Sequence, residues 1–269
     1  MSDGYSRLNG RIRYESTKLR RNLTQAAWSM TRAGRENTGK LAALNGKFAG
    51  RRCFVMGNGP SLLKCDLTLL KNEVTIGSNA QYLSWETMGC IPTFLTVEDR
   101  LVAEDRASDL CALQEPTKIF PKYLLYCLRS SVNTIFINFA VDYQPFPQFS
   151  SDFEEIVYWG GTVSMLNLQL AYYLGCSEIY LIGFDHHYKV PDKIENHVIT
   201  SSGDDVNHIH PNYFGKGYRW HDPNLPRMEQ AYSEARRFLD ARKIVIRNAT
   251  VGGNLDVFER VDYSSLFRK

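Results

Sequence analysis

The feature that most constrains this chain is a glycine turn placed between an apolar run and the start of a helix. Cys53-Phe54-Val55-Met56 is followed at once by Gly57-Asn58-Gly59-Pro60-Ser61-Leu62. Glycine permits a sharp bend and the close approach of a ligand, proline is favoured in the first helical turn, and free N–H groups at a helix start attract anions. The turn therefore predicts a strand–turn–helix unit with a nucleotide phosphate as its ligand. An ordinary tight turn is the alternative.

Downstream of residue 52, short apolar runs alternate with helical patterns, which is typical of an α/β domain with a mainly parallel sheet. The chain has 269 residues, of which 43% are hydrophobic, enough for one large domain. We expect this domain to cover residues 51–269, after an N-terminal extension of residues 1–50. The expected strands are 52–56, 74–77, 93–97, 117–120, 134–139, 178–183 and 244–248, and the expected helices are 79–88, 103–113, 162–174 and 226–241.

Residues 184–224 interrupt this alternation. They are rich in His, Asp, Asn, Gly, Pro and aromatic residues and show no clear period. A loop of this length inside a compact domain usually serves as a lid or a binding loop. We therefore expect a long, histidine-rich lid loop.

The basic character of the chain is concentrated near its N-terminus. Residues 1–52 hold twelve Lys/Arg against three Asp/Glu, although the net charge of the whole chain is only +3. This composition predicts a basic amphipathic helix over residues 16–33, which contacts the main domain or a partner protein, or else a membrane surface. The apolar residues at helical spacing are Leu19, Leu23, Ala26, Ala27 and Met30.

Several classes of protein are disfavoured by what the sequence lacks. No apolar run approaches the ~18 residues that a membrane helix needs, and the N-terminus has no apolar centre of a signal peptide. The six cysteines show no Cys-x-x-Cys spacing. We expect a cytoplasmic protein, or one peripheral at the inner face of the membrane, with no disulfide framework, structural zinc or nucleic-acid partner. A homo-oligomer stays open.

The sequence departs from two common nucleotide-binding motifs. The stretch from Gly34 to Leu41 nearly spells a P-loop, but Leu41 replaces the Ser/Thr that binds magnesium, and no strand precedes it. The glycine turn is no dinucleotide fingerprint, because Leu62 stands at the third glycine position and Asn79 replaces the acidic ribose reader. NAD is therefore disfavoured. Asn58 and Asn79 remain as amides at the carboxyl ends of the first two strands, where they can read a base or ribose.

Polar groups also follow three later element boundaries. Glu98-Asp99 comes after the third strand and is suited to Mg²⁺ or substrate hydroxyls, to a helix cap, or to an ion pair with Arg100. Gly160-Gly161-Thr162 opens a helix and offers a second anion site. Asp185, just past a strand that ends in Gly183, is placed for ribose hydroxyls or acts as a turn residue.

Histidines in the lid loop are candidates for proton transfer near neutral pH. His221 is the preferred base, because it lies just before the helix expected over 226–241, which limits its motion. His208 and His210 are the other candidate bases. Together with Asp205 they form an alternative metal site, although His-x-His is a weak signal for metal.

These residues resemble the domain family named for 6-hydroxymethylpterin diphosphokinase. They are also similar to bacterial sialyltransferases that use CMP-activated sugars and to the central domain of motility-associated flagellin glycosyltransferases. The resemblance spans roughly residues 52–260 and implies a Rossmann-like fold. It rests on the glycine turn, on Gly161-Thr162, and on Leu170-Ala171-Tyr172-Tyr173-Leu174-Gly175 leading to Glu178-Ile179-Tyr180-Leu181-Ile182-Gly183-Phe184-Asp185.

The resemblance also implies roles for individual residues. It implies that His221 is the base. Glu98-Asp99 stands where an Asn-containing segment is expected, so the identity of the donor stays open. The implied nucleotide-binding residues are Gly57, Asn58, Gly59, Ser61, Asn79, Gly161, Thr162 and Asp185, and the implied phosphate-binding residues are Tyr188, Tyr213 and Tyr218.

The implied activity is that of a glycosyltransferase in the assembly of lipopolysaccharide, capsule or flagellin glycans. Its donor would be a CMP-linked nonulosonic acid or related keto-sugar, and His221 would deprotonate an acceptor hydroxyl in a direct displacement that requires no metal or other cofactor. One alternative is Mg²⁺-dependent transfer of diphosphate from ATP to a pterin alcohol, and another is a non-catalytic nucleotide-binding module. The carboxylates implicated by the Mg²⁺ alternative are Glu98, Asp99, Asp185, Asp204 and Asp205.

Overall fold

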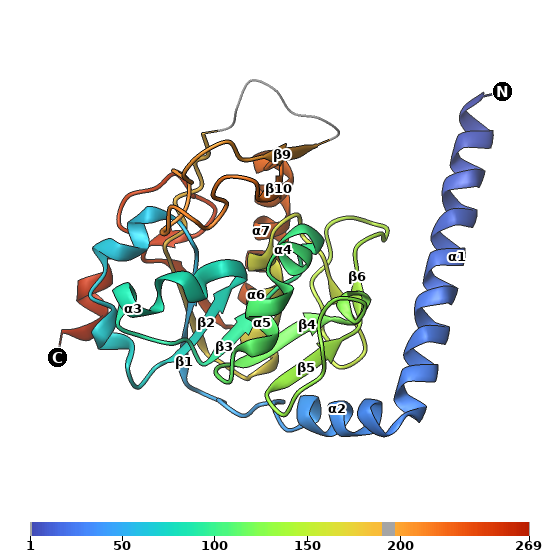
Figure 1. The fold of residues 1–269 in the computed structure, drawn as a ribbon, viewed down its shortest axis with the longest axis horizontal. Helices are drawn as coiled ribbons and strands as arrows, with labels where there is room; N and C mark the ends of the chain where they lie inside the picture. Colours follow the sequence, from blue (N-terminus) through green and yellow to red (C-terminus); the bar gives the residue numbers. More distant parts are fainter. Residues whose placement is uncertain (1, 190–196, 269) are drawn as a thin grey trace.

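The computed structural model describes residues 2–189 and 197–268, with side chains from residue 15 onward. Its centre is an eight-stranded parallel sheet in the order β12-β11-β8-β1-β2-β3-β4-β5, with helices on both faces (Figure 1). This confirms the predicted α/β, Rossmann-like architecture. The strands are β1 (Arg52–Met56), β2 (Val74–Ser78), β3 (Phe94–Thr96), β4 (Thr117–Pro121), β5 (Thr134–Ile137), β8 (Glu178–Ile182), β11 (Val245–Asn248) and β12 (Glu259–Arg260).

The described residues form α-helices and 3-10 helices. The predicted helices over 162–174 and 226–241 are present, whereas those over 79–88 and 103–113 are each divided into two shorter pieces. The α-helices are α1 (Ser2–Met30), α2 (Arg32–Ala42), α3 (Trp85–Met88), α4 (Arg100–Asp105), α5 (Ala107–Ala112), α6 (Val163–Tyr173) and α7 (Leu225–Asp240); the 3-10 helices are η1 (Pro60–Lys64), η2 (Leu67–Leu70), η3 (Asn79–Ser84), η4 (Lys122–Leu124) and η5 (Tyr263–Phe267).

The strand order reverses beside β1. The chain builds the sheet outward from β1 to β5, then returns through α6 and adds β8 on the other side of β1. Such a reversal leaves a crevice at the carboxyl ends of the two strands, which is where open α/β sheets bind their ligands. The fold therefore points to the loops after β1 and β8.

The core follows the period of two that a sheet covered on both faces requires. Cys53 and Val55 of β1 belong to the largest apolar cluster, together with residues of α6 and α7. Phe54 and Met56 belong to a cluster on the opposite face, together with residues of η1 and η2. The sheet is thus buried on both faces, and its carboxyl edge is left for function.

The N-terminal region forms two helices where the spacing predicted one over 16–33. α1 ends at Met30. Thr31 is the N-cap of α2, because its hydroxyl accepts a hydrogen bond from the Gly34 N–H. A Cβ on Gly34 would come within 1.8 Å of the Trp28 carbonyl oxygen, so the close approach of the two helices requires glycine. The stretch from Gly34 to Leu41 lies entirely within α2, so it forms no P-loop.

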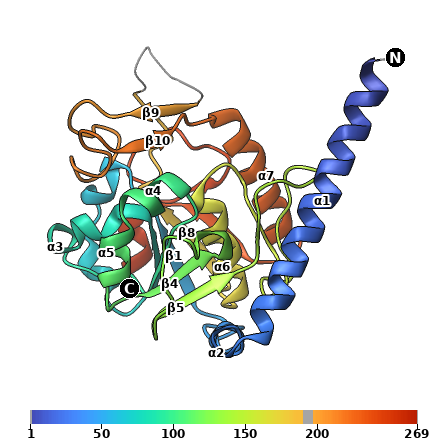
Figure 2. The ribbon, with the colours of Figure 1, turned by 45° about the vertical axis from the view of Figure 1, so that its right-hand side comes forward.

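α2 is docked on the sheet, whereas α1 extends beside the domain (Figure 2). The Asn37 amide bonds both the N–H and the C=O of Phe136 in β5. Leu41 and Leu44 are part of the largest apolar cluster. Among the described residues, no helix has both the length and the apolarity needed to span a membrane.

The expected lid loop contains a short hairpin that the sequence did not predict. β9 (Val198–Thr200) and β10 (Arg219–His221) pair antiparallel and form a small two-stranded sheet (Figure 1). β10 contacts α4. Strands of three residues are too short to show a period in the sequence. A further small sheet joins β6 (Phe139–Ala140) to β7 (Val157–Tyr158).

Candidate functional site

The loops after β1 and β8 meet at the switch point of the sheet. A Cβ on Gly59 would come within 2.2 Å of Asp185 Oδ2, and a Cβ on Gly57 within 2.3 Å of the Gly183 carbonyl oxygen. Gly183 itself has a φ of +73°, in the left-handed region. The glycines of both loops are thus required by the close approach of two stretches of backbone, and they form the floor of a crevice.

The N–H groups of the glycine turn are already hydrogen-bonded within the chain. The Ser61 N–H donates to Asp185 Oδ2 over 3.0 Å, and the N–H groups of Gly57 and Gly59 donate to the carbonyls of Ile182 and Gly183 over 2.7 and 3.0 Å. The Asp185 carboxylate therefore supplies the anion at the start of η1. Phosphate binding by this turn stays a prediction, and in this structure the turn serves to join β1 to β8.

Asn58 and Asn79 differ in how their amides are used. Asn58 Nδ2 donates to Tyr213 Oη over 2.9 Å and to Ser78 Oγ over 3.1 Å, and Asn58 Oδ1 accepts from Gln81 Nε2 over 3.1 Å. Asn58 therefore connects β1 and β2 to the lid. Asn79 Oδ1 is buried and has no hydrogen-bond partner among the described residues, but Asn79 does not line the crevice.

The start of α6 forms the opposite wall of the crevice. Thr162 lies at the helix start that the sequence predicted and is the N-cap, where its hydroxyl accepts from the Ser164 N–H over 3.3 Å. Gly161 precedes it with a φ of +81°. The crevice has a volume of about 50 Å³. It is lined by Gly57, Gly59, Thr162, Ser164, Gly183, Phe184, Asp185, His186, His187, Tyr188, Asn207, His208, Met228 and Tyr232.

The loop expected to be a lid places an Asp–His pair beside this crevice, and His208 of this pair lines it. His208 Nδ1 lies 2.7 Å from Asp205 Oδ2, and the imidazole stacks on the Tyr213 ring with centroids 4.1 Å apart. Burial works to raise the pKa of Asp205, but hydrogen bonds from His208 and from the N–H groups of Asn207 and Phe214 outweigh it and lower the pKa. The Ile209 N–H donates to the Asn58 carbonyl over 2.9 Å, so this part of the loop contacts the glycine turn.

The remaining lid candidates take no part in this pair. His210 Nδ1 accepts a hydrogen bond from the Asn212 N–H over 3.0 Å. Tyr218 packs under the Arg106 guanidinium, 3.7 Å from its ring centroid, and does not line the crevice. Across residues 2–189 and 197–268 no group of three His, Cys, Asp or Glu side chains is arranged to hold a metal ion, so the alternative site of Asp205, His208 and His210 is not formed.

A second Asp–His pair stands at the carboxyl end of β3. His221 Nδ1, on β10, lies 2.9 Å from Asp99 Oδ2, while Asp99 Oδ1 caps α4 by accepting from the Leu101 N–H. The His221 side chain is 51% exposed. The hydrogen bond with Asp99 raises the pKa of His221, and burial opposes this rise. Asp99 thus orients the ring and leaves Nε2 without a hydrogen bond to any described residue.

Glu98 lies beside this pair but is buried. Trp159 Nε1 donates to Glu98 Oε1 over 3.2 Å. Burial, reinforced by the nearby charge of Asp99, raises the pKa of Glu98 to about 8. Near neutral pH its carboxyl group is therefore mostly protonated. The predicted acidic pair thus consists of a neutral acid and a carboxylate that holds a histidine.

Arg227 is a site residue that the sequence analysis missed. Its guanidinium lies 4.3 Å from the Phe146 ring centroid and 4.7 Å from that of Trp159, and its side chain borders Gly161. No ion pair joins it to a described acidic residue. A signal was available, because a cation in the first turn of a helix opposes the helix dipole and so needs another reason to be there. The stacking holds a positive charge beside the start of α6.

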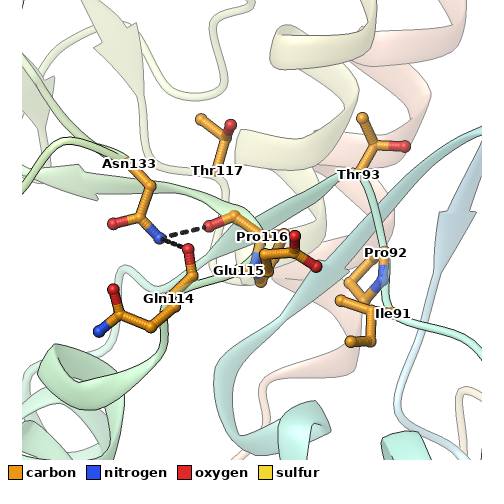
Figure 3. Close-up of a pocket in the computed structure, with 8 residues that line it drawn as sticks. All are labelled: Ile91, Pro92, Thr93, Gln114, Glu115, Pro116, Thr117 and Asn133. Carbon is orange, nitrogen blue, oxygen red and sulfur yellow. Dashed lines mark hydrogen bonds between the residues drawn. The ribbon is translucent and has the colours of Figure 1, made fainter.

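A larger hollow of about 330 Å³ opens at the amino ends of β3, β4 and β5 (Figure 3). Asn133 Nδ2 donates there to the carbonyls of Gln114 and Pro116 over 2.7 and 3.0 Å, which fixes the wall of the hollow. Ligands of open α/β sheets bind at the opposite, carboxyl edge. The smaller crevice is therefore the better candidate.

Comparisons with known proteins identify the family of this chain and a solved structure of similar fold. The sequence model of the family described as 6-hydroxymethylpterin diphosphokinase MptE-like matches residues 30–191. The structure is similar to that of the MAf glycosyltransferase from Magnetospirillum magneticum AMB-1, with a TM-score of 0.51, 16% sequence identity, and coverage of 87% of this chain and 39% of that protein. No curated protein matches the sequence. The chain therefore spans well under half of the glycosyltransferase whose fold it shares.

Proposed function

The chain belongs to the 6-hydroxymethylpterin diphosphokinase MptE-like family, and we propose that it is a glycosyltransferase that moves a sugar from a nucleotide to a hydroxyl acceptor. The donor we propose is a CMP-linked nonulosonic acid or related keto-sugar, used in surface-glycan assembly. The fold shared with the MAf glycosyltransferase supports the choice of a glycosyltransferase. Because the chain spans only 39% of that protein, acceptor and pathway are part of the proposal.

The observation that carries the proposal is the pairing of His221 with Asp99. A sugar transfer to an alcohol needs a base that takes the hydroxyl proton as the new bond forms. The Asp99 carboxylate, 2.9 Å from Nδ1, fixes the tautomer in which Nε2 accepts that proton, and half of the His221 side chain is accessible to an acceptor. The proton moves from the acceptor oxygen to Nε2, while the sugar–phosphate bond breaks and CMP leaves.

The nucleotide would occupy the crevice at the switch point. The start of α6, with Arg227 beside it, would supply positive potential for the phosphate. Asn79 Oδ1, which is unpartnered but does not line the crevice, would become an acceptor for the base or ribose once lid residues move. A volume of about 50 Å³ is below the several hundred Å³ of a typical ligand site. Binding would therefore displace lid residues such as His208 from the glycine turn.

α7 connects the two halves of the proposed site. Met228 and Tyr232 on this helix line the crevice, and Arg227 borders Gly161. His221 lies four residues before α7, on β10, whose Arg219 is bonded to Asp105 of α4. The base and the donor site are thus held by one helix and its preceding strand.

Diphosphate transfer from ATP to a pterin-like alcohol is the second candidate, because the family description names that chemistry. It needs Mg²⁺ to bridge the phosphates, and Asp99 and Asp185 would be the carboxylates available for it. Asp99 is already shared between His221 and the cap of α4, and Asp185 accepts from Ser61. The elevated pKa of Glu98, about 8, makes it a poor magnesium ligand near neutral pH. These arrangements favour the sugar transferase.

The test is a binding screen followed by turnover. Melting temperatures would be measured with CMP, UDP, GDP, ADP and ATP, each with and without Mg²⁺, because a ligand that binds the native state stabilises it. We expect a rise with CMP that is independent of Mg²⁺ and that is lost in Asn79→Ala but kept in the control Asn22→Ala on the exposed face of α1. A rise confined to ATP with Mg²⁺ would establish the second candidate instead. Binding without transfer to any alcohol would leave a nucleotide-binding module.

A further inference from the structure

α1 contacts the domain along one face only. The Trp28 ring packs edge-on against Phe136 of β5 with centroids 6.3 Å apart. One turn earlier, the Gln25 side chain accepts a hydrogen bond from Lys122 Nζ. Arg21, one further turn back, is half-buried. Residues 21, 25 and 28 therefore define the face of α1 that belongs to this chain's own domain.

The opposite face of α1 is apolar and exposed. Leu19, Leu23 and Met30 are 61%, 62% and 76% exposed, although each is a large hydrophobic residue. With Ala26, they fall within an arc of about 60° at the ~100° per residue of an α-helix, and this arc lies about 180° from Trp28. The domain contact therefore leaves the stripe uncovered in this chain.

The stripe has the spacing of a coiled-coil seam. Leu19, Leu23, Ala26 and Met30 are separated by four, three and four residues, which places Leu23 and Met30 at position a and Leu19 and Ala26 at position d of a heptad. Toward the N-terminus the d positions of this register remain apolar, with Tyr5 and Ile12, whereas the a positions Asn9 and Ser16 are polar. In this register Trp28 and Arg21 fall at f, the position that points away from a partner helix.

The residues that flank the stripe are complementary for a second, parallel copy. Glu15 falls at position g and Arg20 at position e of the following heptad. In a parallel pair, g of one helix faces this e position of the other, so two Glu15–Arg20 ion pairs would form, one on each side. No ion pair joins Glu15 or Arg20 to a residue whose side chain the structure describes.

A membrane surface fits this face less well. Helices that lie in the interface present a broad apolar face with Trp, Phe or Leu toward the lipid. Here the stripe is narrow, and Trp28, the aromatic residue suited to that role, is packed on Phe136 instead. A narrow stripe confined to the a and d positions is typical of a coiled-coil seam.

We infer that α1 is a dimerisation helix, which pairs in parallel with α1 of a second copy of this chain along Leu19, Leu23, Ala26 and Met30. The inference is independent of the proposed activity. Because the seam and the domain contact lie on opposite faces of α1, each domain stays on the outside of the pair. The dimer would carry two sites on one stem.

The first experiment measures the mass of the full-length protein in solution by light scattering at about 100 µM, where weak self-association is favoured by mass action. We expect a dimer for the wild type and a monomer for Leu19→Lys/Leu23→Lys. The matched control is Thr17→Lys/Thr24→Lys, which adds the same charge to exposed positions of the same helix outside the seam and should remain dimeric. Equal melting temperatures would show that all three fold.

The second experiment tests the orientation through charge. Glu15→Arg should weaken the dimer by roughly tenfold, because it places like charges together at two symmetric positions. Adding Arg20→Glu to it should restore the affinity, since the exchange recreates both pairs. Leu23→Cys should form a disulfide between copies under mild oxidation, because equivalent a positions meet only in a parallel, in-register pair.

Three results would overturn the inference. A wild type that is monomeric at about 100 µM and sediments with anionic vesicles would assign the stripe to lipid instead. A dimer that survives Leu19→Lys/Leu23→Lys would place the interface elsewhere on the molecule. A dimer that loses no affinity in Glu15→Arg and forms no Leu23→Cys disulfide would exclude the parallel arrangement.

Discussion

Two Asp–His pairs of the same local chemistry occupy different settings in this protein. In the lid, Asp205 meets His208 Nδ1 over 2.7 Å, and the side chains are only 3% and 12% exposed. At the end of β3, Asp99 meets His221 Nδ1 over 2.9 Å, and the side chains are 20% and 51% exposed. A carboxylate on Nδ1 is therefore not sufficient to identify a base, because both pairs have it.

The surroundings separate the two pairs. The His208 imidazole lies parallel to the Tyr213 ring, with an angle of 5° between the planes, and the Asp205 carboxylate also accepts two backbone N–H groups. That pair stabilises a closed loop. No ring of a described residue stacks on His221, and Asp99 raises the pKa of His221 while its side chain stays half exposed. We conclude that exposure, more than pairing, distinguishes the proposed base from the lid contact.

The largest expected effect comes from His221→Ala. Loss of a general base should lower kcat for transfer by about 10²- to 10⁴-fold, while the melting temperature changes little because the side chain is half exposed. The measurement is steady-state transfer with the donor found in the binding screen. His208→Ala is the comparison variant, and it should keep kcat within about tenfold. If His208→Ala were the inactive one, the two pairs would exchange roles.

Asp99→Asn should change the pH profile of transfer. A base must be neutral, so wild-type kcat/KM should rise with pH through the raised pKa of His221. Removing the carboxylate lowers that pKa toward its ordinary value of about 6.5, so the rising limb should move to lower pH, with a maximal rate reduced by about tenfold. Asparagine can still cap α4, which keeps the fold. If the rise of kcat/KM with pH is unchanged in Asp99→Asn, the group whose titration causes it is not His221.

Asp205→Ala should act on stability instead. It removes a buried carboxylate that accepts from His208 and from the N–H groups of Asn207 and Phe214. We expect a loss of about 2–3 kcal/mol, or a melting temperature lower by roughly 5–10 °C. With saturating donor, kcat should stay within about threefold of the wild type. A loss of kcat with an unchanged melting temperature would contradict the lid assignment.

Glu98→Gln should have the smallest effect, and it concerns the acid beside the exposed pair. Because the folded pKa of Glu98, about 8, lies above its ordinary value of 4.5, the wild type should lose stability as pH rises from about 4.5 to about 8. Glutamine mimics the neutral acid and removes this dependence. The variant should therefore melt about 5 °C higher than the wild type at pH 8.5 and at the same temperature near pH 4.5. A difference in melting temperature between the variant and the wild type that stays constant from pH 4.5 to 8.5 would show that Glu98 is ionised in the native state.

Much of the fold was predictable from local patterns. The predicted strand over 52–56 coincides with β1, and the predicted helix over 162–174 agrees with α6, because apolar runs and helix-start signals act over a few neighbouring positions. The division of the N-terminal region at Thr31 was missed. It depends on local contacts of Gly34 with Trp28 and with the Thr31 cap, and on one tertiary contact, the docking of α2 against β5.

The candidate site was predicted only in part. Three predicted residues lie at the switch point: Asn58 and Asp185, which follow β1 and β8, and Thr162, which precedes α6. Their positions next to strand and helix ends were visible in the sequence. Arg227 was missed because its role depends on rings of Phe146 and Trp159, which are remote in sequence. The use of Asp185 as the anion for the Ser61 N–H was also missed, since it requires β8 to lie beside β1.

The sequence by itself determined the elements, the parallel sheet and the edge of that sheet where polar groups gather, because hydrophobic period, glycine turns and caps are local properties of the chain. Only the tertiary structure decided which histidine stays accessible and which is closed against Tyr213. Asp99 and His221 are 122 residues apart, and their pairing depends on how β10 packs beside α4. Burial, and with it the pKa of Glu98 and the freedom of His221, is set by neighbours that the chain brings together only on folding.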